Sequence, residues 1–247
     1  MDNYLIEHLL DLSRRSLDKN IFTFSDFLSE DEQAKLIERK KELAPFTFFG
    51  GAEGTQRNIV RFGSEDCNGR GEDFPVLCIR AQPLNLRFAE TLTHRDILGA
   101  LMSLGIERSS LGDIVVKPDC AYIFCVSRMA PHILDNLIKI KHTDIKCGLC
   151  DELPEGSLFE TKDITIIISS MRADCVTAAL TRLSRGKTEA LFNEKKVFIN
   201  GAVCEKADSQ LKPEDKLSVR GIGKFIIHSQ SGTSKKGRIF LEISKFV

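Results

Sequence analysis

The N-terminal part of the chain has the apolar spacing of helices. Apolar residues recur at helical spacing near the N-terminus and share one face, namely Leu5, Ile6, Leu9 and Leu10. A second helix is predicted to begin after Ser29, because Glu32 three residues later completes a capping box. Pro45 marks its end. The pattern predicts that the chain starts with two amphipathic helices.

A glycine-rich turn follows. Residues 46–63, FTFFGGAEGTQRNIVRFG, predict two short strands around Gly50, Gly51 and Gly54. A Walker-type phosphate loop needs a Lys followed by Ser or Thr, which this segment lacks. We therefore expect these glycines to serve backbone geometry. The polar, glycine-rich residues 63–75 predict a linker.

The middle of the chain alternates strands and helices in the order βαββαβ. The predicted elements are strands at 74–82, 112–119, 120–127 and 143–150, and helices at 92–106 and 129–141. This order is that of a ferredoxin-like split βαβ sandwich, which RNA-recognition modules share. Those modules stack bases on strand aromatics. Tyr122 and Phe124 fit either such a face or a strand that is half core and half surface.

Two short motifs in this region imitate catalytic sequences. Residues 94–96 spell the His-Arg-Asp of a kinase loop, but no other kinase segment accompanies them. Helix initiation at Thr93, with Asp96 three residues on, explains them better. Cys147 and Cys150 form a C-x-x-C pair without two further zinc ligands at regular spacing. We expect structural cysteines, no metal, no cofactor and no catalytic residue.

The C-terminal third is predicted to be a domain of two helices and a small sheet. After an acidic linker at 151–163, residues 164–170 predict a buried strand. The first helix is predicted to bury Val176, Ala179, Leu180 and Leu183, and the second, capped by Ser184, to turn Ala190 and Leu191 inward. Asn200-Gly201 is a strong hairpin turn signal. Further strands are predicted at 211–219, 223–227 and 237–246, with a loop at 228–237.

Charge divides the chain into two parts. Residues 1–163 hold 20 Lys and Arg against 27 Asp and Glu, a net charge of −7. Residues 164–247 hold 15 against 8, a net charge of +7. A basic block indicates either a polyanionic partner or a domain that is basic for solubility.

Length and cysteine usage place the protein in a broad class. The 247 residues suffice for two or three small domains, and 42% hydrophobic with 28% charged content is that of an ordinary globular protein. Eight scattered cysteines without a secretory signal predict reduced thiols in the cytoplasm. No apolar run approaches the roughly 18 residues of a membrane span, so we expect no membrane association.

The start of the second helix breaks a helix rule. Ser184 is followed by Arg185 and Lys187, although the positive end of a helix dipole favours acids. Each cation is expected to cost a few tenths of a kcal/mol. A bound phosphate would explain them, because helix N-termini are anion sites and RNA phosphates are bound by Lys and Arg. We expect recognition of RNA phosphates and shape rather than base reading.

Residues 172–220 resemble the alpha-L RNA-binding motif, named after a ribosomal small-subunit protein, S-four. The matching pieces are Arg172 with Asp174, Ser184-Arg185 with Lys187, residues 197–201, and residues 215–220. Three positions depart from the motif. Gly186 replaces a more usual Ser or Thr, Cys175 replaces an aliphatic or basic residue, and Lys196 replaces the closing glycine, so that Asn193 or another residue must end the helix.

The whole chain resembles the YlmH family of bacterial RNA-binding proteins. The segments FFGGAEGTQR and HRDILGALMSLGIERSSLGDIVV and the C-terminal module occur in that family's order. The resemblance implies a non-enzymatic protein that docks on ribosomal RNA of the large subunit, with peptidyl-tRNA as a further contact, in translation or ribosome-associated quality control. It also implies genes near cell-division genes. An RNA-modifying enzyme and a cell-division scaffold stay open as alternatives.

These observations predict an α+β protein with three domains: an N-terminal α+β domain (1–75), a ferredoxin-like, RRM-like domain (76–160) and an alpha-L RNA-binding domain (161–247). We expect a cytoplasmic monomer that contacts RNA and the ribosomal large subunit. Asp174 is expected to orient Arg172 or a backbone amide, and Lys206, Lys212 and Lys216 to be a solvated face. The predicted RNA-binding residues are Arg172, Arg182, Ser184, Arg185, Lys187, Lys195, Lys196, Asn200, Arg220 and Lys224.

Overall fold

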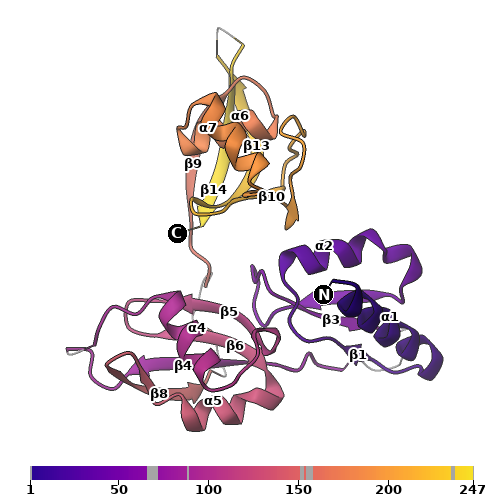
Figure 1. Cartoon of the computed structure of the whole chain (residues 1–247), viewed down its shortest axis with the longest axis vertical. Helices are drawn as coiled ribbons and strands as arrows, with labels where there is room; N and C mark the ends of the chain where they lie inside the picture. Colours follow the sequence, from indigo (N-terminus) through magenta and orange to yellow (C-terminus); the bar gives the residue numbers. More distant parts are fainter. Residues whose placement is uncertain are drawn as a thin grey trace. The chain divides into compact units, whose positions relative to one another are not determined.

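The computed structural model describes residues 2–65, 72–87, 89–150, 153, 158–234 and 237–246. The predicted linkers fall in part on residues 66–71, 151–152 and 154–157, outside this range. The chain forms two compact units: Met1–Ser29 with Leu36–Leu158, and Glu30–Lys35 with Phe159–Val247. It has mixed α+β structure with three antiparallel sheets in its described part (Figure 1). Across those residues, no helix has both the length and the apolar composition needed to span a membrane.

The N-terminal part of the first unit packs helices on a small sheet of order β1-β3-β2. Its apolar side chains converge because Leu9 and Leu12 of the first helix meet Val60 and Phe62 of β3 in one buried cluster. Both predicted helices and both predicted strands are present. The elements are α1 (Asp2–Lys19), β1 (Thr23–Phe24), α2 (Glu30–Glu38), η1 (Lys40–Glu42), β2 (Phe46–Phe49) and β3 (Ile59–Phe62). Of α2, only Leu36–Glu38 belong to this unit, because Glu30–Lys35 group with the second one.

The turn between β2 and β3 needs its glycines for geometry, as predicted. Gly51 and Gly54 have φ of 103° and 85°, in the left-handed region. A Cβ on Gly50 would lie 2.4 Å from the carbonyl oxygen of Arg57. The Arg57 guanidinium donates to the carbonyl oxygens of Phe27, Arg108 and Leu111. These bonds hold the turn against the segment before α2 and against the start of β5 (Leu111–Val116) in the same unit.

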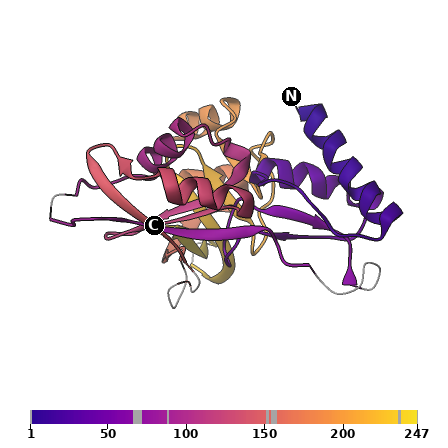
Figure 2. The same ribbon diagram turned by 90° about the horizontal axis from the view of Figure 1, so that it is seen from below.

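The central sheet has the predicted interleaved βαβ connections. Its order, β5-β6-β4-β8-β7, places β6 between β4 and β5, and β4 between β6 and β8. Helices α4 and α5 cover the same face (Figure 2), where Ile97, Leu101 and Ile133 join the buried cluster. The elements are β4 (Val76–Pro83), α4 (His94–Ser103), η2 (Arg108–Ser110), β5 (Leu111–Val116), β6 (Ala121–Val126), η3 (Ser127–Met129), α5 (Ala130–Asn136), β7 (Lys139–Ile140) and β8 (Thr143–Leu149).

A stacking face at Tyr122 and Phe124 is not present. Both side chains are buried, Phe124 completely. The glycine turn covers this face, since a Cβ on Gly51 would lie 2.4 Å from the Phe124 ring. All six residues of β6 are buried, so the half-surface alternative is wrong as well.

The predicted motifs of the central segment have structural roles. Thr93 and Asp96 form a reciprocal capping box at the start of α4. Cys147 lies in β8, and burial raises the pKa of its thiol to about 11, so the metal-binding thiolate form is disfavoured at neutral pH. Within the described residues, no three His, Cys, Asp or Glu side chains gather as metal ligands.

The second unit is a six-stranded antiparallel sheet of order β11-β10-β12-β13-β14-β9, with α6 and α7 on one face (Figure 1). Val176 and Phe192 of these helices join Leu217, Phe225 and Leu241 in its core. The elements are β9 (Thr161–Ile168), α6 (Ala173–Thr181), α7 (Arg185–Asn193), β10 (Val197–Ile199), β11 (Ala202–Val203), β12 (Lys216–Val219), β13 (Gly223–Thr233) and β14 (Ile239–Phe246).

Two predictions for this unit need correction. The strand at 164–170 is not buried: β9 is an edge strand, and Ile167 is 53% exposed because only alternate residues face the core. The predicted loop 228–237 is wrong in its first part, since β13 continues to Thr233 in pairing with β14. On α7, Leu191 packs against the core as predicted and Ala190 is half-buried, while Thr188 and Phe192 are buried residues that the prediction did not name.

Candidate nucleic-acid interface

The N-terminus of α6 is closed by contacts within the protein. The Ala173 amide donates to Ser209 O at 2.8 Å, and the Asp174 amide to Ala207 O at 2.9 Å. The Asp174 carboxylate accepts the Cys175 amide at 2.8 Å. These bonds use the donors that a free helix end would offer to an anion. Helix α6 is therefore not an open phosphate site.

Arg172 is held by Asp174, as predicted. Its Nε lies 3.1 Å from Asp174 Oδ1 and its Nη2 lies 2.7 Å from Asp174 Oδ2. This bidentate pair lowers the pKa of Asp174 and raises that of Arg172. A carboxylate in the first turn of α6 also complements the helix dipole. The charge of Arg172 is thus largely balanced inside the protein.

The N-terminus of α7 is open. Arg182 ends α6 in the left-handed conformation, with φ of 56°, and Ser184 is the N-cap of α7. The side chain of Ser184 makes no capping hydrogen bond within the described residues. The first amide of the helix with a described acceptor is that of Thr188, which donates to Ser184 O at 2.9 Å. The amides of residues 185–187 have no acceptor in the described part of the chain.

The side chains around this helix start favour an anion. Arg185 and Lys187 are exposed and form no ion pair with any described residue. Between them, a Cβ on Gly186 would meet nothing within 4 Å of the described atoms, so packing does not require glycine there. The bare glycine leaves the backbone amides accessible. Three features therefore favour an anion at the N-terminus of α7. They are the two cations, the three amides of residues 185–187 and the positive end of the helix dipole.

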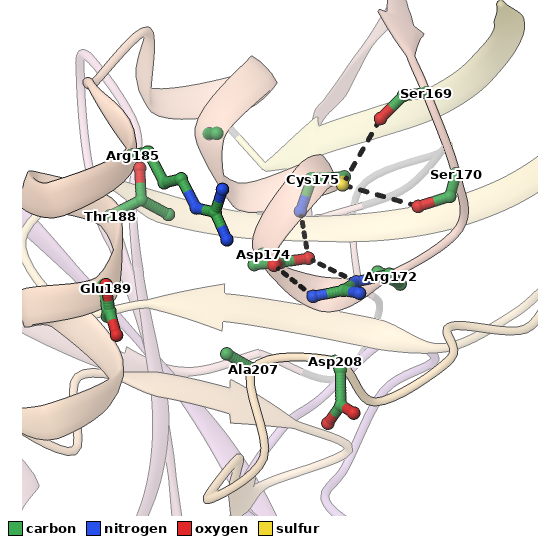
Figure 3. Close-up of a pocket in the computed structure, with 11 residues that line it drawn as sticks. Ser169, Ser170, Arg172, Asp174, Cys175, Arg185, Thr188, Glu189, Ala207 and Asp208 are labelled. Atoms are coloured by element: carbon green, nitrogen blue, oxygen red, sulfur yellow. Dashed lines mark hydrogen bonds and ion pairs between the residues drawn. The ribbon is translucent and has the colours of Figure 1, made fainter.

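A pocket of about 650 Å³ lies beside this helix start (Figure 3). It brings together Arg172 and Arg185, two of the predicted RNA-binding residues, from the N-terminal ends of α6 and α7. It also holds three carboxylates, of Asp174, Glu189 and Asp208, of which the sequence singled out only Asp174. Ser169, Ser170, Cys175 and Thr188 complete the polar lining.

Three further predicted cations, Lys195, Lys196 and Arg220, lie near the other end of α7, about 13 Å from its start. Lys195 follows the helix with φ of 51° and is the left-handed residue that replaces the missing glycine. Lys196 pairs with Glu194 at 2.5 Å. The Arg220 guanidinium stacks over the Phe198 ring, 5.3 Å from its centre. The predicted patch is therefore divided into two groups.

Two predicted residues are engaged in other contacts. Asn200 occupies the predicted hairpin turn with φ of 50°, before Gly201 at 84°. Its side chain donates to Asp215 Oδ1 at 2.8 Å and accepts the Lys216 amide at 2.9 Å, so both amide atoms hold the hairpin. Lys224 forms an ion pair with Glu30 at 2.9 Å. RNA contact by Asn200 and Lys224 stays a prediction.

The comparisons with known proteins bear on the whole chain. Residues 71–151 match the family model described as "Putative RNA-binding domain in YlmH". A Bacillus subtilis protein named "Ribosome-associated protein quality control protein P2" is 27% identical over 241 residues, which cover 94% of this chain and 91% of that protein. These matches make the chain similar to proteins of the YlmH family.

A solved structure titled "Cell division protein ylmH from Streptococcus pneumoniae" is 22% identical, with a TM-score of 0.48 over 60% of this chain and 90% of that one. The YlmH domain match covers β4 to β8, whereas the open helix start and its pocket lie after it in the chain.

Glu189 and Asp208 were missed as pocket residues because their spacing in the sequence does not connect them with Arg172 and Asp174. Asp208 reaches α6 only because the backbone of residues 207–209 accepts the first amides of that helix. Glu189 lies one turn after Arg185 on α7, and this i,i+4 spacing was the available signal.

Proposed function

We propose that this protein binds folded RNA through the N-terminal turn of α7. Arg185, Lys187 and the amides of residues 185–187 hold a backbone phosphate there. The observation that carries this proposal is the open helix start, whose amides and two cations have no partner among the described residues and whose Gly186 is uncovered. Without a ligand this arrangement only costs stability, since both cations oppose the helix dipole. A phosphate turns the same groups into favourable partners.

The setting of this activity is proposed to be the ribosome. The protein docks on ribosomal RNA of the large subunit, with peptidyl-tRNA as a further contact, in ribosome-associated quality control. The name of the Bacillus subtilis relative and the RNA-binding description of the YlmH family model support this role. In this view the chain is a cytoplasmic, monomeric binder rather than an enzyme. It contains an N-terminal domain (1–75), an RRM-like domain (76–160) and an alpha-L domain (161–247).

The second group of cations extends the contact in this proposal. Lys195, Lys196 and Arg220 lie one helix length from the phosphate site, and Arg220 already stacks on Phe198. Phosphates along an RNA backbone are spaced closely enough to meet both groups. Binding through several phosphates makes the affinity strongly dependent on salt.

A charge-deletion experiment tests the proposal. Arg185→Ala with Lys187→Ala is expected to weaken binding of ribosomal RNA about tenfold or more in a filter-binding titration. The slope of log affinity against log salt concentration should fall by about two. Lys212→Ala with Lys216→Ala removes the same charge from exposed positions that do not line the pocket and should change the affinity less than about twofold. Equal losses in both variants would contradict the assignment.

Co-sedimentation with ribosomal subunits tests the setting. The wild-type protein should migrate with large subunits at low salt and dissociate at high salt. A scaffold for cell-division proteins would not migrate with them. An RNA-modifying enzyme would leave a covalently altered nucleotide in the bound RNA, which mass spectrometry of that RNA detects.

A further inference from the structure

The pocket beside α7 is larger than a phosphate requires. Its volume of about 650 Å³ lies in the range of about 300–1,000 Å³ that small-molecule sites occupy. Its walls come from three places in the sequence: the strand end at Ser169 and Ser170, the first turns of α6 and α7, and the segment at Ala207 and Asp208 (Figure 3). The cavity offers room for one nucleotide beside the open helix start.

The charges of the pocket do not suit a second phosphate. Arg172 is already bound bidentately by Asp174. That leaves the guanidinium of Arg185 against the carboxylates of Glu189 and Asp208. A dianion inside would meet more negative than positive charge. A neutral group that donates hydrogen bonds fits better, because carboxylates only accept them.

A nucleobase has the matching chemistry. Carboxylates accept hydrogen bonds from the amino groups of bases, and Arg guanidinium planes stack on base faces. Among the described residues no hydrogen bond or ion pair occupies the carboxylate oxygens of Glu189 or Asp208, although Asp208 lies near enough to Arg172 to raise the pKa of that guanidinium. The hydroxyls of Ser169 and Ser170 contact the Cys175 sulfur, a weak acceptor, at 3.4 Å each, and they can rotate to donate to or accept from a base.

We propose that this pocket takes one unpaired nucleobase that carries an amino group, A, C or G, and discriminates against uracil. The inference rests on the proposed RNA binding at the α7 start, which delivers the nucleotide. Uracil has two carbonyl oxygens and a single N–H on its ring, so the carboxylates of Glu189 and Asp208 would repel most of its polar edge. The pocket thus adds base selection to phosphate binding.

Four RNA hairpins test this inference with the full chain. They share one stem and differ only in a single bulged nucleotide, A, C, G or U, and a fully paired hairpin is the reference. Fluorescence anisotropy at fixed salt should give about five- to tenfold tighter binding of the A, C and G bulges than of the U bulge. The U bulge should bind like the paired hairpin.

Isosteric variants assign the selection to the pocket. Glu189→Gln with Asp208→Asn should reduce the preference over uracil to less than about twofold, without weakening binding of the U bulge. Glu205→Gln with Glu242→Gln removes two exposed carboxylates outside the pocket and should keep the preference.

The outcomes separate this inference from the proposed function. If the wild-type protein binds all four bulges equally and retains its salt dependence, base selection is overturned while phosphate binding stands. A preference that survives Glu189→Gln with Asp208→Asn also overturns the pocket assignment. If none of the five hairpins binds at low salt, the RNA-binding proposal fails together with the inference.

Discussion

The start of α7 allows one substitution to separate stability from binding. Lys187 is the third helical residue after the N-cap Ser184, so Lys187→Glu creates the Ser-x-x-Glu order of a capping box. It also replaces a cation by an anion at the positive end of the helix. We expect the helix to become more stable and RNA binding to become weaker. A charge change at an ordinary surface position would not raise helix stability and lower RNA affinity at the same time.

The stability gained by Lys187→Glu can be worked out from the geometry of this turn. Removing the cation restores a few tenths of a kcal/mol, and an acid in the first turn adds about 0.5 kcal/mol. The reciprocal cap raises the total to about 1 kcal/mol, because the Ser184 side chain makes no cap bond to any described residue now. That gain of about 1 kcal/mol corresponds to about fivefold slower local opening, which hydrogen exchange of residues 188–193 measures in the full chain. RNA affinity should fall more than about tenfold, with a smaller salt slope.

Lys206→Glu is the matched control, since it makes the same charge change at an exposed residue outside any helix. Exchange in α7 should then stay unchanged and the affinity should fall only slightly. Faster exchange of α7 in Lys187→Glu would refute the dipole and capping argument. Unchanged RNA affinity in that variant would refute the phosphate site.

Two further predictions concern the first unit. Gly51→Ala should destabilise this unit by about 3 kcal/mol, because φ is 103° and the new Cβ would lie 2.4 Å from the Phe124 ring. Gly99→Ala is the control: its Cβ would meet nothing within 4 Å on α4, so it should stabilise the unit by about 0.5–1 kcal/mol. Chemical denaturation measures both. Lys141 and Thr93 lower the pKa of Asp96 to about 2, so its stabilisation, complete above about pH 4, should be lost as pH falls toward 2. Asp96→Asn should remove this part of the pH dependence.

Each of these two predictions can be contradicted by a specific result. Equal effects of Gly51→Ala and Gly99→Ala would show that the glycine turn does not press on the Phe124 ring. Parallel stability curves of the wild type and Asp96→Asn between about pH 4 and 2 would show that the carboxylate gains nothing on folding.

Periodicity and turn residues predicted most elements because these signals are local. Thr93 with Asp96 starts α4, and Asn200-Gly201 forms the hairpin turn, as their spacing indicates. Whether a strand is buried on both faces was harder to predict. The apolar residues 164–168 fit a strand buried on both faces, yet only contacts with distant β14 decide that β9 is an edge.

The sequence predicted the cations of the candidate site and Asp174, but not its acids Glu189 and Asp208. The run Ser184-Arg185-Gly186-Lys187 violates helix rules, so the amino-acid sequence alone marks it as unusual. Asp208 lies 23 residues after Arg185 and joins the same pocket through backbone contacts of its neighbours. Phe124 was misjudged for the same reason, because Gly51 in the turn that covers it lies 73 residues earlier.

A comparison of two helix starts within the chain supports a functional reading of α7. Helix α4 has a Thr93 cap, and the reciprocal Asp96 occupies its third position. Helix α7 has no side-chain cap bond within the described residues, and it carries cations at its first and third positions with a glycine between them. Together these features cost about 2 kcal/mol relative to a start like that of α4. Since the same chain builds the favourable start elsewhere, the unfavourable one is best explained by a ligand that reverses its cost.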